Sequence, residues 1–184
     1  MSMALPVLDQ IVRSGLEQAR ESRRVAVVRD DGLFVRRAEP ADARELHALL
    51  ENYVAPGMLL PRTLRQVYRS IRDFIVVIDH GRIIGCAALR IYSAELAEIG
   101  ALAVAAGHQG AGLGRRLVET LVHDAHALGL QRVFALTLQD AFFHRIGFET
   151  TLISEFPEKV AADCSTCARR AACAEIAVAR TLNN

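Results

Sequence analysis

A strand, a turn and a helix meet in the stretch Val104-Ala105-Ala106-Gly107-His108-Gln109-Gly110-Ala111-Gly112-Leu113-Gly114, here called the glycine segment. The apolar run before it is typical of a buried strand, and apolar residues recur at helical spacing after Leu113. Its glycines lack Cβ atoms, so backbone can approach a ligand closely. The first amides of the helix would point outward at the positive end of the helix dipole. The segment therefore predicts an anion site suited to a pyrophosphate.

Two other phosphate-binding motifs do not fit this segment. A P-loop needs Lys and Ser or Thr after its second glycine, but Leu113 follows Gly112. A dinucleotide fingerprint starting at Gly110 would place Arg115 where its third glycine belongs. Neither a P-loop nor a dinucleotide fold is predicted.

Outward from the glycine segment, the apolar pattern alternates between strand and helix periods. Upstream we expect strands at 25–28, 33–37, 74–78, 82–91 and 95–105 and helices at 40–53 and 63–71. Downstream we expect helices at 113–128 and 141–145 and strands at 132–138, 148–153 and 174–182. Hairpins beside strand–helix–strand crossovers predict an α/β (α+β) fold with a mixed, mostly antiparallel sheet and helices on both faces.

The bulk composition bounds the class of protein. The chain has 184 residues, 52% hydrophobic and 23% charged, with a formal net charge of +1. We expect one domain at 31–184 after a helical extension at 1–30. The near-neutral charge predicts no nucleic-acid partner. No apolar run approaches the ~18 residues of a membrane span, and no signal peptide precedes the domain, which predicts a cytoplasmic protein.

Gln109, Gly112 and Gly114 fit the pattern Q/R-x-x-G-x-G/A, and the segment resembles the coenzyme A loop of the GNAT superfamily of N-acetyltransferases. The expected order of strands and helices is also that of the GNAT fold. The resemblance implies acetyl-CoA as co-substrate and a central strand pair that splays apart. It implies that backbone of Leu102, Ala103 and Val104 pairs with pantetheine, and that a loop holds the pyrophosphate through Gln109, Gly110, Ala111, Gly112, Leu113, Gly114 and Arg115.

GNAT enzymes bring an amine directly onto the thioester, and a base must remove its proton first. Many members keep a glutamate where this chain has Glu98, so the resemblance implies Glu98 as general base, with Glu95 as the alternative. The short helix at 141–145 lacks the tyrosine that often protonates the leaving thiolate. Phe143 or its neighbour Phe142 is expected to pack against pantetheine, with core packing as the alternative.

A narrower resemblance covers residues 33 to the end and concerns the acceptor. It resembles the acetyltransferase domain of N-acetylglutamate synthases, above all the short bacterial ones, and implies L-glutamate as acceptor. We expect Arg62 to bind a carboxylate, with Lys159 and Arg90 as further candidates. Gly100 departs from the arginine of many short members. The resemblance rests on Leu59-Leu60-Pro61-Arg62-Thr63, Leu96-Ala97-Glu98-Ile99, Phe142-Phe143-His144-Arg145-Ile146-Gly147-Phe148 and Pro157-Glu158-Lys159-Val160.

Three cysteines, Cys164, Cys167 and Cys173, gather near the end of the chain, within a segment at about 157–175. Three thiols without a histidine make an incomplete zinc set, so we expect no bound metal. Two other functions stay open: acetylation of a different small-molecule amine, and a non-catalytic acyl-CoA-binding regulatory module. The sequence leaves the oligomeric state open, with a homodimer as one option.

Overall fold

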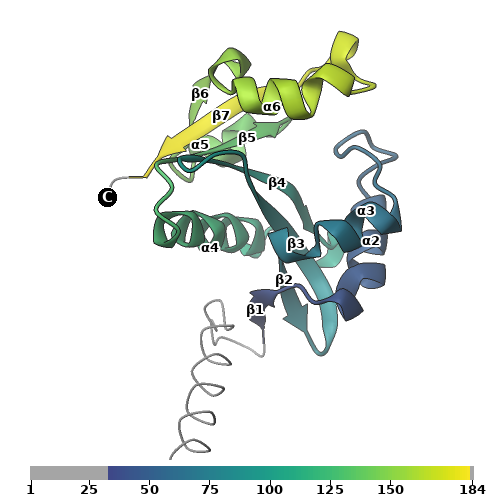
Figure 1. The fold of residues 1–184 in the computed structure, drawn as a ribbon. Coiled ribbons are helices and arrows are strands. Elements are labelled where there is room, and N and C mark those ends of the chain that lie inside the picture. Colours follow the sequence, from purple (N-terminus) through teal and green to yellow (C-terminus); the bar gives the residue numbers. More distant parts are fainter. Residues whose placement is uncertain (1–32, 183–184) are drawn as a thin grey trace, which may run out of the picture.

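The computed structural model describes residues 33–182 and has the expected α/β architecture (Figure 1). One seven-stranded sheet runs in the order β1-β2-β3-β4-β5-β7-β6. Its strands are Phe34–Arg37 (β1), Phe74–Asp79 (β2), Arg82–Ile91 (β3), Leu96–Val104 (β4), Arg132–Thr137 (β5), Glu149–Thr151 (β6) and Ile176–Thr181 (β7). Only β4 and β5 pair in parallel. The predicted mixed, mostly antiparallel sheet is confirmed.

Four of the five helices in the described residues lie close to their predicted ranges, and Pro157–Ala162 (α6) is the exception. The other four are Ala43–Glu51 (α2), Leu64–Arg69 (α3), Leu113–Ala127 (α4) and Asp140–His144 (α5), with short 3-10 turns between several of the helices. Thr63 caps α3 as its sequence suggests, since its hydroxyl accepts from the amide of Gln66. None of the helices within 33–182 is long and apolar enough to cross a membrane.

Three expectations need correction or fall outside the structure. The predicted extension at 1–30 and strand at 25–28 lie outside the described residues, and the partner of β1 is β2. The strand expected at 148–153 is shorter, because a 3-10 turn follows it directly. Helix α6 was not predicted: only Pro157 marks its start, and none of its residues is buried.

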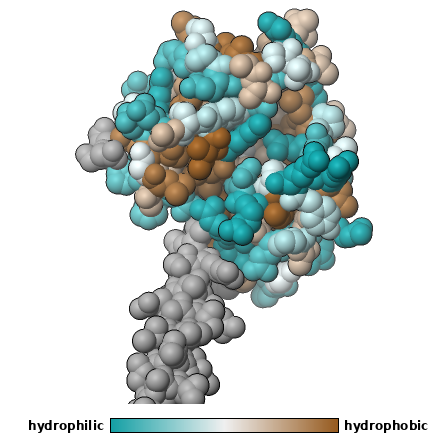
Figure 2. Space-filling model, viewed as in Figure 1, coloured by the Kyte–Doolittle hydropathy of each residue, from teal (hydrophilic) through white to brown (hydrophobic). Residues whose placement is uncertain are grey.

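Apolar side chains cover the two faces of the sheet in three groups. One group contains α4, α5 and one face of β1 to β5, with Leu117, Val118 and Leu121 at its centre. A second packs α2 and α3 against the other face of β2, β3 and β4. A third group, around Phe134 and Phe156, lies on the same face of the sheet as the second group. It covers the part of that face beyond β4. Figure 1 shows α4 and the α2–α3 pair on opposite sides of the sheet, and Figure 2 shows hydrophilic and hydrophobic residues interspersed on the outer surface.

A bulge in β4 separates it from β5. The register with β3 passes from Cys86↔Ala103 to Ala88↔Gly100, so β4 carries one extra residue there. Ala101 has a positive φ of 49°, which is uncommon without glycine. Bulges bend a strand and increase its twist. The parallel pairing with β5 accordingly ends at Glu98↔Phe134, and β4 beyond that point has no strand partner on its β5 side.

Candidate active site

Beyond Glu98, β4 no longer pairs with β5, and we call this place the splay. The glycine segment leaves β4 at this end and enters α4. Gly110 and Gly112 both have φ of +79°, and an added Cβ at either would meet no atom within 4 Å. These two glycines are therefore required by the backbone conformation itself. Gly112 is the N-cap of α4 and offers no side-chain cap, so the first amides of the helix are left for another acceptor. At Gly114 a Cβ would lie 3.5 Å from the ring of Phe142.

The side chain of Gln109 braces the segment from within. Its amide nitrogen donates to the hydroxyl of Tyr53 at 2.8 Å and to the carbonyl of Val104 at 3.2 Å. The Tyr53 hydroxyl also donates to the Val104 carbonyl. The motif glutamine thus ties the turn to the end of β4, and Val104 already has hydrogen bonds on the carbonyl that we expected to face pantetheine.

Glu98 sits on β4 at the last residue before the splay, and its side chain is 12% exposed. The hydroxyl of Tyr92 donates to Glu98 Oε2 at 2.9 Å, and Lys159 Nζ approaches the same oxygen at 2.8 Å. Asp163 lies next to both donors. Lys159 Nζ is 3.1 Å from Asp163 Oδ2, and the Tyr92 hydroxyl donates to that carboxylate as well.

Arg90 completes this group, which we call the Glu98 cluster: Arg90, Tyr92, Glu98, Lys159 and Asp163. Arg90 lies opposite Glu98 across the β3–β4 ladder, and its Nη1 is 2.8 Å from both oxygens of Asp163. Its guanidinium also stacks over the ring of Tyr92, 5.2 Å from the centroid. Two positive and two negative side chains therefore balance within the cluster.

Burial and charge fix the ionisation of the cluster. Burial raises the pKa of Tyr92, and the neighbouring Glu98 charge raises it further, so the phenol stays protonated. Burial lowers the pKa of Lys159, but the charges of Glu98 and Asp163 outweigh it and the net shift is upward. Burial likewise opposes ionisation of Asp163, yet bonds from Tyr92 and Lys159 lower its pKa. Lys159 and Asp163 remain a charged pair at neutral pH.

Arg62 lies on the loop before α3, exposed, with no side-chain hydrogen bond or ion pair to another residue of 33–182. Burial raises the pKa of Asp73, and the positive charges of Arg90 and Arg62 oppose that rise. Both arginines therefore act on the same carboxylate at the start of β2. The charge of Arg62 also reaches Cys86, whose pKa burial raises to about 12. Arg62 is an available cation on the side of the sheet that carries Glu98.

The structure separates several residues that the sequence grouped. Phe143 is only 4% exposed and packs edge-on against Phe148 in the core, so Phe142 is the ring beside the glycine segment. Glu95 is exposed, while Glu98 lies inside a cluster. Sequence reasoning missed Tyr92 and Asp163 as members of this site. The four-residue spacing between Lys159 and Asp163 was the available signal.

The segment at about 157–175, which contains Cys164, Cys167 and Cys173, borders this site. Cys164 follows Asp163 directly, and Arg169 donates to the carbonyl of Gly57 at 2.8 Å, which joins the segment to the loop between α2 and α3. Within 33–182, no three His, Cys, Asp or Glu side chains are arranged to hold a metal ion.

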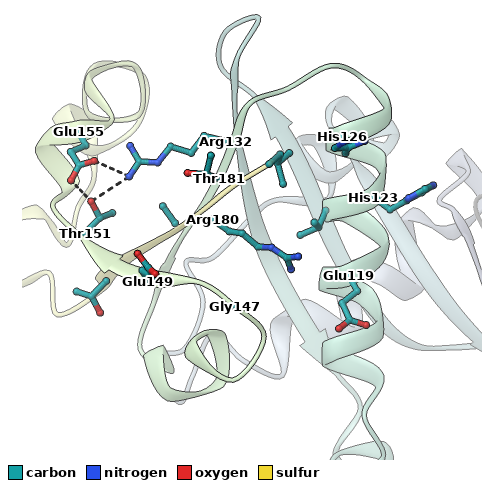
Figure 3. A pocket seen from close by; sticks show the side chains of 14 residues that line it. Glu119, His123, His126, Arg132, Gly147, Glu149, Thr151, Glu155, Arg180 and Thr181 are labelled. Atoms are coloured by element: carbon teal, nitrogen blue, oxygen red, sulfur yellow. Dashed lines mark hydrogen bonds and ion pairs between the residues drawn. The ribbon is translucent and has the colours of Figure 1, made fainter. Parts of the chain in front are cut away.

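A cavity of about 830 Å³ lies elsewhere, between α4 and the strands β6 and β7 (Figure 3). Arg132 and Glu155 form an ion pair of 2.8 Å at its wall, and Arg180 donates to the carbonyl of Ile146. None of its lining residues belongs to the glycine segment or the Glu98 cluster. We place the candidate active site at the splay, because the unpaired backbone of β4 and the partly buried carboxylate of Glu98 meet there.

Comparison with known proteins decides the family. Residues 43–148 match the acetyltransferase (GNAT) family. The chain belongs to the GNAT acetyltransferase family. It is an acetyl-CoA-dependent N-acetyltransferase of the GNAT type, related to amino-acid acetyltransferases, and it carries the GNAT fold with the splayed strand pair of that family. The predictions of family, fold class and co-substrate are confirmed.

Several GNAT proteins are similar over most of this chain. An uncharacterized N-acetyltransferase of Chlorobaculum tepidum is 40% identical over 148 residues, which cover 80% of this chain and 96% of the relative. An amino-acid acetyltransferase of Mycobacterium tuberculosis is 37% identical over 124 residues, covering 65% and 70%. Among solved structures, N-acetylglutamate synthase from Neisseria gonorrhoeae, complexed with coenzyme A and N-acetyl-glutamate, superposes with a TM-score of 0.75 at 27% identity. That match covers 85% of this chain but only 37% of the synthase chain.

Proposed function

We propose that this GNAT enzyme transfers the acetyl group of acetyl-CoA to the α-amine of L-glutamate, forming N-acetylglutamate for arginine biosynthesis. The observation that carries the proposal is the Glu98 cluster beside the splay. It places one partly buried carboxylate within a charge-balanced set and leaves Arg62 as an available cation nearby. The relatives named amino-acid acetyltransferase and N-acetylglutamate synthase support the same acceptor.

On the donor side, the proposal assigns coenzyme A to the glycine segment. The amides of residues 110–115, at the N-terminus of α4, would hold the pyrophosphate, because Gly112 leaves them without a side-chain cap. Backbone of Leu102 and Ala103 in the splayed part of β4 would pair with the pantetheine arm. The Val104 carbonyl would take part only after exchanging its bonds from Tyr53 and Gln109.

On the acceptor side, the proposal assigns Glu98 as general base. The α-ammonium of glutamate must lose a proton before its nitrogen can attack the thioester carbon, and a carboxylate within hydrogen-bond reach can accept that proton. The nitrogen then forms the amide bond as the carbon–sulfur bond breaks and coenzyme A leaves as a thiolate. The nitrogen loses its second proton in this step, and that proton passes to the thiolate or to solvent. Arg62, together with Arg90, would orient the substrate carboxylates by bidentate or charge-assisted hydrogen bonds.

The decisive experiment follows thiol release from acetyl-CoA with glutamate, glutamine, aspartate and a set of polyamines as acceptors. We expect kcat/KM to be highest for L-glutamate. No turnover with glutamate at millimolar concentration, but turnover with another amine, would replace glutamate by that acceptor. Coenzyme A binding without turnover of any amine would instead identify a non-catalytic module.

A further inference from the structure

The two oxygens of the Glu98 carboxylate have different surroundings. Oε2 accepts the hydrogen bond from Tyr92 and the ion pair from Lys159, at 2.9 and 2.8 Å. Oε1 has no such partner within residues 33–182, and it lies 3.9 Å from the place that a Cβ on Gly100 would occupy. The residue two positions along the same face of β4 is thus a glycine. Within the described residues, one oxygen has two polar partners and the other has none.

Asp163 contacts the two partners of Glu98 Oε2, Tyr92 and Lys159. It accepts from Lys159 at 3.1 Å, from the Tyr92 hydroxyl and from Arg90 at 2.8 Å. Two of these three donors are the ones that hold Glu98 Oε2. Each of the two donors therefore lies between two carboxylates. The Lys159 ammonium has a proton for each of them, whereas the two carboxylates share the single proton of the Tyr92 hydroxyl.

Asp163 comes from a part of the chain that the family match does not include. That match ends at residue 148, whereas Lys159 and Asp163 lie four residues apart along α6 and its C-cap. Phe156, just before α6, stacks on Phe134 of β5 at 4.1 Å between ring centroids. This packing holds α6 against the strand that pairs with Glu98.

We propose that Asp163 is a positioning residue for the general base: through Tyr92 and Lys159 it fixes Glu98 Oε2 and keeps Oε1 open toward the acceptor amine. The inference rests on the proposed function, in which Glu98 accepts the proton of the ammonium. Without Asp163, the Lys159 ammonium would have one carboxylate instead of two. It would then be free to bridge both oxygens of Glu98, and the open oxygen would be lost.

The charges around Glu98 predict in which direction each substitution shifts the pH dependence of the reaction. The cations Arg90 and Lys159 and the carboxylates Asp163 and Glu175 surround Glu98. Tyr92 adds a hydrogen bond but no charge. Replacing Asp163 by Asn should move the acidic limb of the kcat/KM profile to lower pH by about one unit, and Lys159→Met should move it to higher pH by a similar amount.

Lys159 is the only lysine in the sequence, which provides a readout that needs no turnover. In full-length protein labelled with ¹³C,¹⁵N-lysine, all lysine side-chain resonances come from this one residue. They are followed by NMR from pH 4 to 9. We expect one step that reports proton uptake by Glu98 and disappears in Glu98→Gln. Asp163→Asn should move that step to lower pH, and Ser165→Ala, in the same segment but bonded to Ala161, should leave it in place.

Kinetics with the acceptor that the wild type uses complete the test. Asp163→Asn should lower kcat about tenfold to a hundredfold with little change in the acetyl-CoA KM, and Asp163→Glu should recover part of it. A lysine step that persists in Glu98→Gln, or that Asp163→Asn does not move, would overturn the proposal. Absence of glutamate turnover by the wild type would instead remove the proposed acceptor, and the NMR result would still decide the role of Asp163.

Discussion

The donor and acceptor sides of the splay are built in different ways. The glycine segment is eleven consecutive residues, and its chemistry comes from backbone amides and two positive-φ glycines. The Glu98 cluster is made of side chains from β3, β4 and α6, up to 73 positions apart in the chain. The donor side therefore depends on local conformation, whereas the acceptor side depends on packing that brings distant segments together. Substitutions should separate these two kinds of site.

The largest effect should come from the acceptor side, at Glu98. Glu98→Gln keeps the shape and removes the base, so kcat should fall by about 10² to 10⁴ while the acetyl-CoA KM stays within a few-fold. Steady-state kinetics on purified enzyme measure both. The matched control is Glu95→Gln. Glu95 is exposed and lies three residues before Glu98, so this variant should retain turnover. Loss of activity in the control alone would make Glu95 the base.

The next largest effect should be on acceptor binding. Arg62→Ala should raise the KM for glutamate by about 10- to 100-fold, the value of a charge-assisted hydrogen bond to a carboxylate, and leave the acetyl-CoA KM almost unchanged. Arg65→Ala, an exposed arginine three residues along, should change neither. An equal rise in both KM values would indicate that Arg62 supports the fold instead of the substrate.

A smaller effect should appear on the donor side, at Gly112. Alanine there must adopt φ near +79°, which costs about 1–2 kcal/mol of unfolding free energy. Reoriented amides should also raise the acetyl-CoA KM about tenfold. Gly129→Ala provides the same backbone strain at the other end of α4, where an added Cβ also meets nothing within 4 Å. Chemical denaturation should show similar losses for both variants, but only Gly112→Ala should change the KM.

The smallest effect is expected at Gly100. A Cβ there would lie 3.8 Å from the Glu98 carboxyl carbon, which is ordinary van der Waals contact. Gly100→Ala should therefore keep kcat and the glutamate KM within about twofold of the wild type. A tenfold loss would mean that the acceptor occupies the space above Gly100 more tightly than the Glu98 cluster suggests.

This contrast also explains what the sequence could predict. The strand, turn and helix around the glycine segment follow from periodicity and glycine spacing, so these elements were predicted with nearly correct boundaries. The coenzyme A site on them stays a prediction. Glu98 was proposed through family resemblance. Its partners were not, because no local pattern tells that α6 packs across β5 and delivers Asp163 to Tyr92. Lys159 was expected to face the substrate, and only tertiary packing shows that it pairs with Glu98.

The position of β7 has a consequence for how the molecule reaches this arrangement. β7 follows β6 in the chain but lies between β5 and β6, and within 33–182 it is the only strand that pairs with β6. The sheet therefore cannot grow strand by strand from its N-terminal side. Its β5–β7 pairings join residues 39 to 49 positions apart, and such long-range pairing slows folding. A chain cut before Ile176 would leave the Val133-Phe134-Ala135-Leu136 edge of β5 exposed, a template for aggregation instead of a trimmed enzyme.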